Sequence, residues 1–166
     1  MNKAEYGDVI GVRHGIYTHF GIYVDDEHVI HYDGKEDDMF LRHMYIDETC
    51  MDRFLGGVDE YYVYKFSDKG YRNSKAIRSK KLNRSYRDVA SGMYLLLKLK
   101  NKLKYKVYSP EETVKRARSR IGERKFNLAL NNCESFAIWC KTGITESSQV
   151  DLIIQALFIE SIISII

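Results

Sequence analysis

The sequence predicts one α+β domain, with strands in the first half of the chain and helices in the second. Its 166 residues are 45% apolar and 30% charged, a composition typical of a globular domain with a buried core. Short apolar runs rich in aromatic and β-branched residues occur before residue 67. Two later segments carry helix start and stop signals. We therefore expect a single domain over residues 1–166, with an antiparallel sheet packed against helices.

Three early apolar runs are expected to form strands: 9–12, 19–24 and 28–32. The acidic residues at 25–27 supply turn chemistry between the second and third runs, which predicts an antiparallel hairpin. A short helical stretch is expected at 47–57, closed by Gly56 and Gly57, and a further strand at 60–66.

The register of this hairpin decides where its histidines lie. With a three-residue turn, Gly21 faces His31 and Tyr23 faces Val29. His19 and His31 then become diagonal neighbours on one face of the sheet, within reach of each other's side chains. Gly21 would leave room beside the His31 ring. A slip of one residue would send the two rings to opposite faces.

The first helix is expected over residues 109–122. Ser109 is a good N-cap, Pro110 suits the first helical position, and Glu112 completes a capping box. Gly122 is a typical helix end. The apolar stripe of this helix would consist of Val114, Ala117 and Ile121.

The second helix is expected over 131–143 and carries a cysteine in its first turn. There the free backbone N–H groups and the helix dipole favour an anion, so we expect a lowered pKa for the Cys133 thiol. Cys140 lies deeper in the helix and is expected to pack in the core, together with Phe136 and Ala137. Cys50 has no basic neighbour in sequence. The three cysteines lack the spacing of a zinc site or a disulfide framework, and we expect no metal or other cofactor.

A thiolate nucleophile needs a base, and that base needs a group that orients its ring. Cys133, His19 and His31 could supply these three groups. Taken singly, each is more often a structural residue, because strand histidines are commonly held by hydrogen bonds. The catalytic interpretation therefore depends on the three residues meeting in space.

Charge is distributed unevenly along the chain. Residues 1–64 carry a net charge of −9, whereas residues 65–106 hold 14 Lys or Arg against 2 Asp or Glu, a net of +12. Such a block favours an anionic partner such as a membrane surface, and the alternative is a solvated surface that keeps the protein soluble. No sequence pattern of a nucleic-acid-binding module occurs, so we do not expect a nucleic acid partner.

The last segment, 148–166, is expected to form an apolar helix. It is interrupted by polar residues and is shorter than the roughly 20 apolar residues that span a bilayer. It could pack in the core, lie on a membrane surface or mediate self-association. The first residues lack the apolar core of a signal peptide, so we expect a cytoplasmic protein that is at most peripheral to a membrane.

Four segments together resemble the lecithin:retinol acyltransferase-like (LRAT domain) family, in particular its bacterial members. They are Gly7-Asp8-Val9-Ile10, His19-Phe20-Gly21-Ile22-Tyr23-Val24, Val29-Ile30-His31-Tyr32 and Asn132-Cys133-Glu134-Ser135-Phe136. The spacing of twelve residues between the two histidines also matches. Ser135 replaces the family's usual histidine and Phe20 its usual tryptophan. We find no alignment of the basic segment at 67–106 to members of the family, and we treat it as an insertion.

This resemblance implies a circularly permuted relative of the NlpC and papain-like cysteine hydrolases. It implies that Cys133 is the nucleophile that forms an acyl-thioester, that His19 is the general base and later the acid, and that His31 orients His19. It also implies acyl transfer or hydrolysis on phospholipid or other lipid esters, of phospholipase A or acyltransferase type, without a cofactor. Two alternatives stay open: a cysteine amidase or peptidase, and a non-catalytic binding module that keeps the fold.

Overall fold

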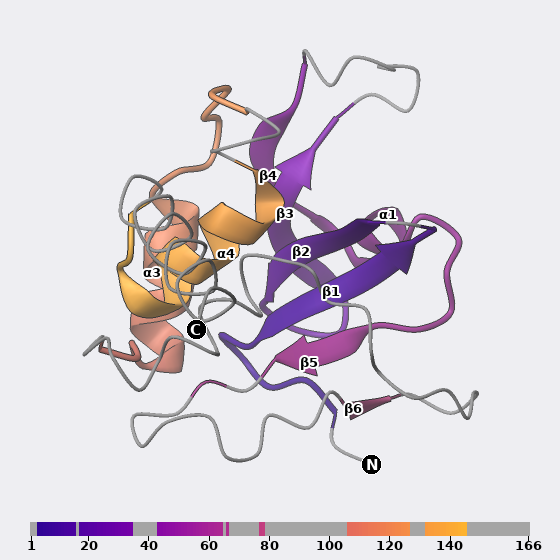
Figure 1. Ribbon diagram of the computed structural model, residues 1–166, viewed down its shortest axis with the longest axis horizontal. Helices are drawn as coiled ribbons and strands as arrows, with labels where there is room; N and C mark the ends of the chain where they lie inside the picture. The colour runs from indigo at the N-terminus through magenta and orange to yellow at the C-terminus, as the bar shows by residue number, and fades with distance from the viewer. Residues whose placement is uncertain are drawn as a thin grey trace, which may run out of the picture.

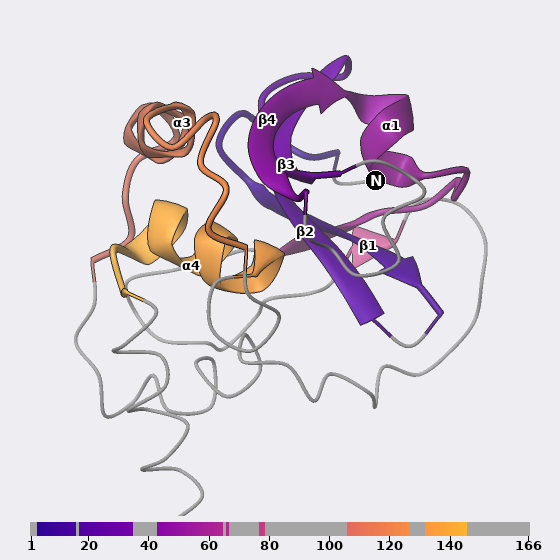
Figure 2. The ribbon, with the colours of Figure 1, turned by 90° about the horizontal axis from the view of Figure 1, so that it is seen from above.

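The computed structural model describes residues 3–15, 17–34, 43–64, 66, 77–78, 106–126 and 132–145. These residues form an antiparallel sheet with helices on both sides of it (Figure 1), which confirms the expected α+β class. Seen from above in Figure 2, α3 (Pro110–Arg118) and α4 (Cys133–Thr142) lie on one side of the sheet and α1 (Met51–Leu55) lies on the other. Within the described part of the chain, no helix has the length and apolarity needed to cross a membrane.

The sheet has the strand order β4-β3-β2-β1-β5-β6 among the described residues, and all of its pairs are antiparallel. The strands are β1 (Val9–His14), β2 (Tyr17–Tyr23), β3 (His28–Asp33), β4 (Tyr45–Cys50), β5 (Tyr62–Tyr64) and β6 (Ile77–Arg78). The predicted early strands and the hairpin between the second and third are confirmed. The strand expected at 60–66 is present but shorter.

The hairpin has the predicted register. Gly21 pairs with His31, and Tyr23 pairs with Val29. The pairing of β2 with β1 is longer, since it continues as far as the His14 and Tyr17 pair. The first half of β2 is therefore paired with β1 on one edge, while β3 has already diverged from the other edge. This divergence opens the sheet at the site described below.

Residues 45–50 form strand β4 rather than part of a helix, so the helical prediction for 47–57 is wrong over its first four residues. The whole strand pairs with β3, from His28 opposite Cys50 to Asp33 opposite Tyr45. Ile46 is fully buried at the sheet, and this burial outweighs the weak local helix signals. Helix α1 (Met51–Leu55) occupies the remainder, and Gly56 ends it in the left-handed conformation as expected.

The two later helices are α3 (Pro110–Arg118) and α4 (Cys133–Thr142). The Ser109 hydroxyl accepts the Glu112 amide as predicted, but α3 ends at Arg118, four residues before the expected stop. Ile121 therefore lies in the turns after the helix and is 44% exposed, so its placement on the apolar stripe was wrong. Helix α4 ends at Gly143, which has the left-handed φ of a helix C-cap.

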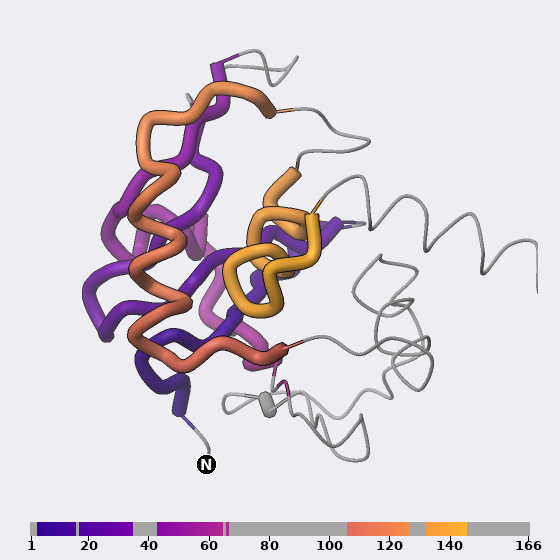
Figure 3. Tube along the Cα trace, turned by 90° about the vertical axis from the view of Figure 1, so that its left-hand side faces the viewer, coloured from indigo at the N-terminus to yellow at the C-terminus, as the bar shows by residue number. Residues whose placement is uncertain are grey.

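Two apolar clusters cover the two faces of the sheet. The larger cluster joins β2, β3 and neighbouring strands to α3 and α4, whose Cα traces run close together in Figure 3. It includes the predicted core residues of the helices: Val114, Ala117, Phe136, Ala137 and Cys140. The smaller cluster covers the opposite face around Phe54 of α1. Arg53 of α1 donates to the Asp33 carboxylate at 2.8 Å and fastens this helix to β3.

Two predictions fall largely outside the described residues. The basic insertion at 67–106 is described only at the backbone of β6 and at Lys106. The apolar helix predicted at 148–166 lies wholly outside the described ranges.

Candidate active site

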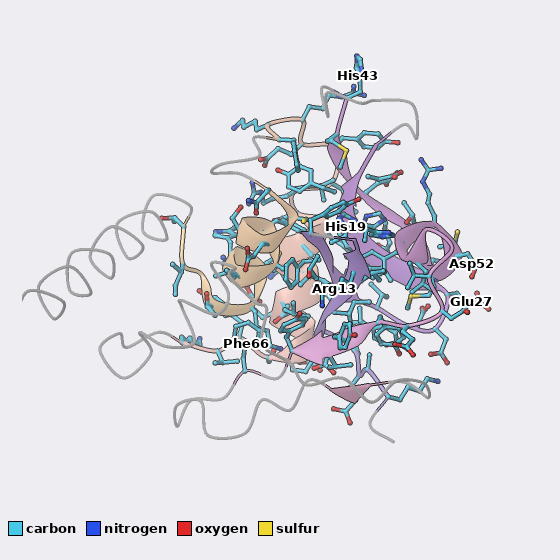
Figure 4. All side chains as sticks on the ribbon, turned by 45° about the vertical axis from the view of Figure 1, so that its right-hand side comes forward. Arg13, His19, Glu27, His43, Asp52 and Phe66 are labelled. Atoms are coloured by element: carbon cyan, nitrogen blue, oxygen red, sulfur yellow. The ribbon has the colours of Figure 1, made fainter. Side chains whose placement is uncertain are left out.

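The two histidines of the hairpin contact each other directly. Nε2 of His19 lies 2.8 Å from Nδ1 of His31 in a hydrogen bond. Their rings are nearly perpendicular, with an angle of 82° and a centroid separation of 5.0 Å. The expectation that His19 and His31 share a face within side-chain reach is confirmed. In Figure 4 the label of His19 lies near the centre of the molecule, whereas that of His43 lies at its periphery.

Phe54 and Gly21 hold this histidine pair in place. The Phe54 ring lies 5.3 Å from the His19 ring and 5.2 Å from the His31 ring, measured between centroids. A Cβ added at Gly21 would lie only 2.6 Å from a methyl group of Val29, 3.0 Å from the Phe54 ring and 3.3 Å from Cβ of His31. Gly21 is thus the small residue that lets Phe54 and both imidazoles pack together, of which the sequence predicted only the room beside the His31 ring.

His31 has two further polar neighbours. Its Nε2 lies 2.7 Å from the Thr49 hydroxyl on β4, and its Nδ1 lies 2.9 Å from the Tyr32 carbonyl oxygen. The Thr49 hydroxyl also lies 3.4 Å from the Cys50 carbonyl oxygen. Thr49 was missed from the sequence because its contact depends on β4, which was expected to be helical.

Cys133 is the first residue of α4, where a reciprocal cap fixes the start of the helix. The Asn132 side chain accepts the Ser135 amide at 2.9 Å, and the Ser135 hydroxyl accepts the Asn132 amide at 2.9 Å. This capping box satisfies two backbone donors that would otherwise lack a partner. Ser135, a departure from the family motif, therefore has a structural role in orienting the turn that carries Cys133.

The sulfur of Cys133 lies at the edge of β2. Its Sγ is 3.9 Å from the Thr18 carbonyl oxygen, and the backbone amide of Phe20 also interacts with it. The backbone groups of Tyr23 bond on the side of β1, to Gly7 and Asp8.

Backbone groups alternate along a strand, so those of Thr18 and Phe20 point to the edge that β3 has left. The thiol occupies that edge, against the backbone on both sides of His19.

The imidazoles and the thiol come from different layers of the molecule. The histidine rings pack on Phe54, on the face covered by α1, whereas Cys133 adjoins the core cluster of α3 and α4. The backbone of β2 at Thr18 to Phe20 lies between them, where the pairing of β2 with β3 has ended. The structure thus brings His19 and His31 into contact, and it places the Cys133 sulfur against the backbone of Thr18 and Phe20 on either side of His19.

The histidines are neutral at physiological pH. Burial, reinforced by the nearby His31 and His14, lowers the pKa of His19 to about 3. Burial likewise lowers the pKa of His31 to about 4, although Asp33 and the Tyr32 carbonyl partly oppose this shift. Each ring therefore carries a single proton, and the hydrogen bonds around it determine which nitrogen holds that proton.

The helix start predicted a lowered pKa for the Cys133 thiol, but the pKa of this thiol is raised. Burial raises its pKa to about 11, and the nearby carboxylate of Glu134 adds to the shift. The backbone amides of Phe20, Cys133 and Glu134 lower the pKa, but they do not offset the burial. The expected lowering of the thiol pKa is therefore wrong for the protein without substrate: the resting group is a neutral thiol.

The thiols of the other two cysteines take no part in the hydrogen bonds described for this site, although the backbone carbonyl of Cys50 lies near the Thr49 hydroxyl. Cys140 is fully buried in the core cluster, as predicted, and burial raises the pKa of its thiol. Cys50 is exposed at the start of α1. Across the described ranges, no group of three His, Cys, Asp or Glu side chains has the arrangement of a metal site.

A hydrogen-bonded histidine pair on the sheet and a helix-borne cysteine against the backbone beside one of these histidines are the residue types of a cysteine–histidine site. A model of the family described as lecithin retinol acyltransferase matches residues 2–146. The chain therefore belongs to the lecithin retinol acyltransferase family.

Three mammalian proteins named lecithin retinol acyltransferase are similar in sequence to the chain. The bovine protein is 29% identical over 158 residues, covering 87% of this chain and 57% of the bovine one. The rat protein is 27% identical over 164 residues, covering 91% and 60%. The human protein is 28% identical over 158 residues, covering 87% and 57%. The matched segment thus accounts for less than two thirds of each relative's length.

Proposed function

We propose that the protein is a cysteine-dependent acyltransferase or phospholipase-type acyl hydrolase that acts on lipid esters through an acyl-thioester on Cys133. The observation that carries this proposal is the position of the Cys133 sulfur, against the backbone on both sides of His19, while His19 is hydrogen-bonded to His31. In the proposed roles, Cys133 is the nucleophile, His19 is the base and acid, and His31 orients His19.

In the first half-reaction, Sγ of Cys133 attacks the ester carbonyl of the lipid. A sulfur–carbon bond forms, and the thiol proton passes to His19. The carbon–oxygen bond to the leaving alcohol then breaks, and His19 returns the proton to that oxygen.

In the second half-reaction, a hydroxyl of an acceptor lipid or a water attacks the thioester carbonyl. His19 takes the proton of the attacking group and delivers it to the departing sulfur, which restores the neutral pair.

The resting state is a neutral thiol beside a neutral imidazole. The raised pKa of Cys133 and the lowered pKa of His19 both oppose a thiolate–imidazolium pair. The proton therefore moves together with the attack on the carbonyl and not before it. Such a site reacts when a bound ester presents its carbonyl, which limits side reactions of a free thiolate.

Family membership and the names of the relatives support a lipid ester as substrate, because those names describe acyl transfer and include the phospholipid lecithin. The position of Cys133 after the histidine strands in the chain also supports a permuted relationship to the NlpC and papain-like hydrolases. A cysteine amidase or peptidase would use the same three groups, so the substrate assay must include that class.

The proposal is tested by incubating the protein with phosphatidylcholine vesicles and, separately, with short peptide amides. We expect release or transfer of fatty acyl groups from the vesicles, its loss in Cys133→Ser, and unchanged activity in Cys50→Ser, the matched change at an exposed cysteine. Cleavage of the peptides alone would assign the site to the amidase class. Equal acyl release by wild type and Cys133→Ser would contradict the proposed nucleophile.

We also propose that the basic segment at 65–106 contacts an anionic membrane surface, since its net charge is +12. Binding to vesicles that contain phosphatidylserine should weaken as salt rises, and binding that ignores salt would contradict this contact. The apolar segment at 148–166 is proposed to join the same surface or to mediate self-association. Truncation after residue 147 distinguishes these roles. Loss of vesicle binding would assign the segment to the membrane surface, and loss of a dimer in light scattering would assign it to self-association.

A further inference from the structure

The hydrogen bonds around the histidine pair allow two arrangements of protons, and only one of them supports catalysis at His19. Nε2 of His19 is engaged by His31, so Nδ1 is the ring nitrogen left to take the thiol proton of Cys133. A neutral imidazole can accept a proton at Nδ1 only when its own proton is on Nε2. His19 must therefore donate from Nε2, and His31 must accept at Nδ1.

In the supportive arrangement, each proton has one acceptor. Nε2–H of His19 donates to Nδ1 of His31 at 2.8 Å, and Nε2–H of His31 donates to the Thr49 hydroxyl oxygen at 2.7 Å. The Thr49 hydroxyl then donates to the Cys50 carbonyl at 3.4 Å. In this relay the three donors, which are the two Nε2–H groups and the Thr49 hydroxyl, each have one acceptor.

In the opposing arrangement, His31 carries its proton on Nδ1 and donates it to the Tyr32 carbonyl at 2.9 Å. The same proton must also serve Nε2 of His19, which is then unprotonated. His19 holds its own proton on Nδ1 and cannot accept one from the thiol. In this arrangement the Thr49 hydroxyl donates to the unprotonated Nε2 of His31, and the proton on Nδ1 of His31 is shared between two acceptors. Two donors are then bonded where the relay bonds three.

We propose that Thr49 is a positioning residue that selects the productive tautomer of His31, and through it that of His19. When its hydroxyl accepts Nε2–H of His31, the hydroxyl proton can still bond to the Cys50 carbonyl. This additional bond opposes the Tyr32 carbonyl, which favours the other tautomer. This inference rests on the proposed function for its catalytic consequence, whereas the tautomer itself can be measured without any substrate.

The direct test is the protonation of the imidazole nitrogens, observed by NMR of protein with ¹⁵N-labelled histidine. We expect Nε2–H on both His19 and His31 in the wild type. In Thr49→Val, which keeps the side-chain shape but has no hydroxyl, we expect the His31 proton to move to Nδ1. Thr49→Ser should retain the wild-type tautomers. A wild-type His31 with its proton on Nδ1 would overturn the inference, and this readout holds even where a variant folds poorly.

A kinetic test compares kcat with KM, because the loss of a positioning residue lowers kcat whereas the loss of a substrate contact raises KM. Thr49→Val should lower kcat by about tenfold or more, leave KM near its wild-type value, and be rescued by Thr49→Ser. A Thr49→Val protein that folds and keeps its kcat would overturn the inference. Failure of the proposed function has a different signature, because Cys133→Ser would then retain activity whatever the His31 tautomer is.

Discussion

The sulfur of Cys133 lies 3.9 Å from the Thr18 carbonyl oxygen, at the edge of β2 that β3 leaves unpaired. This contact places the thiol of α4 against the backbone beside His19, whose ring packs on Phe54 at the opposite face of the sheet. If β3 paired with β2 along its whole length, ladder hydrogen bonds would occupy the groups that the thiol contacts. The early end of the β2–β3 ladder is therefore the structural feature on which the site depends.

The two histidines should differ in how much activity their loss removes. His19→Ala removes the proton acceptor of both half-reactions, whereas His31→Ala removes only the group that orients it. We expect a loss of about 10³-fold or more in kcat/KM for His19→Ala and a smaller loss for His31→Ala. Steady-state assays on a lipid ester measure both values. Equal or reversed losses would contradict the assigned roles.

The activity should not fall near pH 6.5, where an imidazole with an ordinary pKa becomes protonated. Because the pKa of His19 is lowered to about 3, the ring stays an unprotonated base well below its usual value of 6.5. Because the pKa of Cys133 is raised to about 11, no alkaline activation by a thiolate is expected near neutrality. We predict a nearly constant kcat/KM from about pH 5 to pH 9 on an uncharged ester. A fall in kcat/KM centred on pH 6 to 7 would contradict a neutral His19.

The same burial predicts that the fold loses stability in acid. Both histidines have lower pKa values in the folded protein than in the unfolded chain, so the unfolded chain binds more protons below about pH 6.5. The free energy of unfolding should therefore fall as pH drops from 6.5 toward 4, by up to about 1.4 kcal/mol per pH unit for each histidine.

Urea unfolding at several pH values measures this slope. His31→Gln should remove one of the two contributions and flatten the dependence between pH 6.5 and 5. A wild-type stability that does not change over that interval would show that the two rings are not buried and neutral.

Gly21 should tolerate no side chain. A methyl group at Gly21 would meet Val29 at 2.6 Å and Phe54 at 3.0 Å, so Gly21→Ala must displace Phe54 or the histidine pair. We expect a loss of about 1–3 kcal/mol in the free energy of unfolding and a fall in kcat.

Gly57→Ala is the matched control, since Gly57 has open space around it and only its left-handed φ opposes a side chain. It should cost stability without affecting kcat. A fully active Gly21→Ala would show that the packing of Phe54 on the imidazoles has no part in the reaction.

Local signals predicted the parts of the site that local chemistry determines. The turn at 25–27 fixed the register that pairs Gly21 with His31, and the cap at Asn132 fixed the start of α4. Both depend on residues a few positions apart. The sequence motif therefore placed the two imidazoles and the thiol on their elements correctly.

Long-range contacts determine what the sequence did not predict. Thr49 reaches His31 only because β4 pairs with β3, and this pairing overrides the helical signals near residue 50. The thiol pKa depends on burial by the folded chain, which outweighs the helix N-terminus. Neither effect has a signature within a few residues of Cys133.

The central claim is that the Cys133 sulfur becomes acylated. Intact-mass analysis after incubation with a mixed phospholipid extract tests it most directly, with peptide mapping to locate the adduct and Cys50→Ala as the control for an exposed thiol. We predict a mass increase of one fatty acyl group on Cys133, its persistence in Cys50→Ala, and its loss in Cys133→Ala, whose thermal unfolding should match the wild type. Lipid turnover without any acyl group on Cys133, or with the acyl group on another residue, would contradict the account.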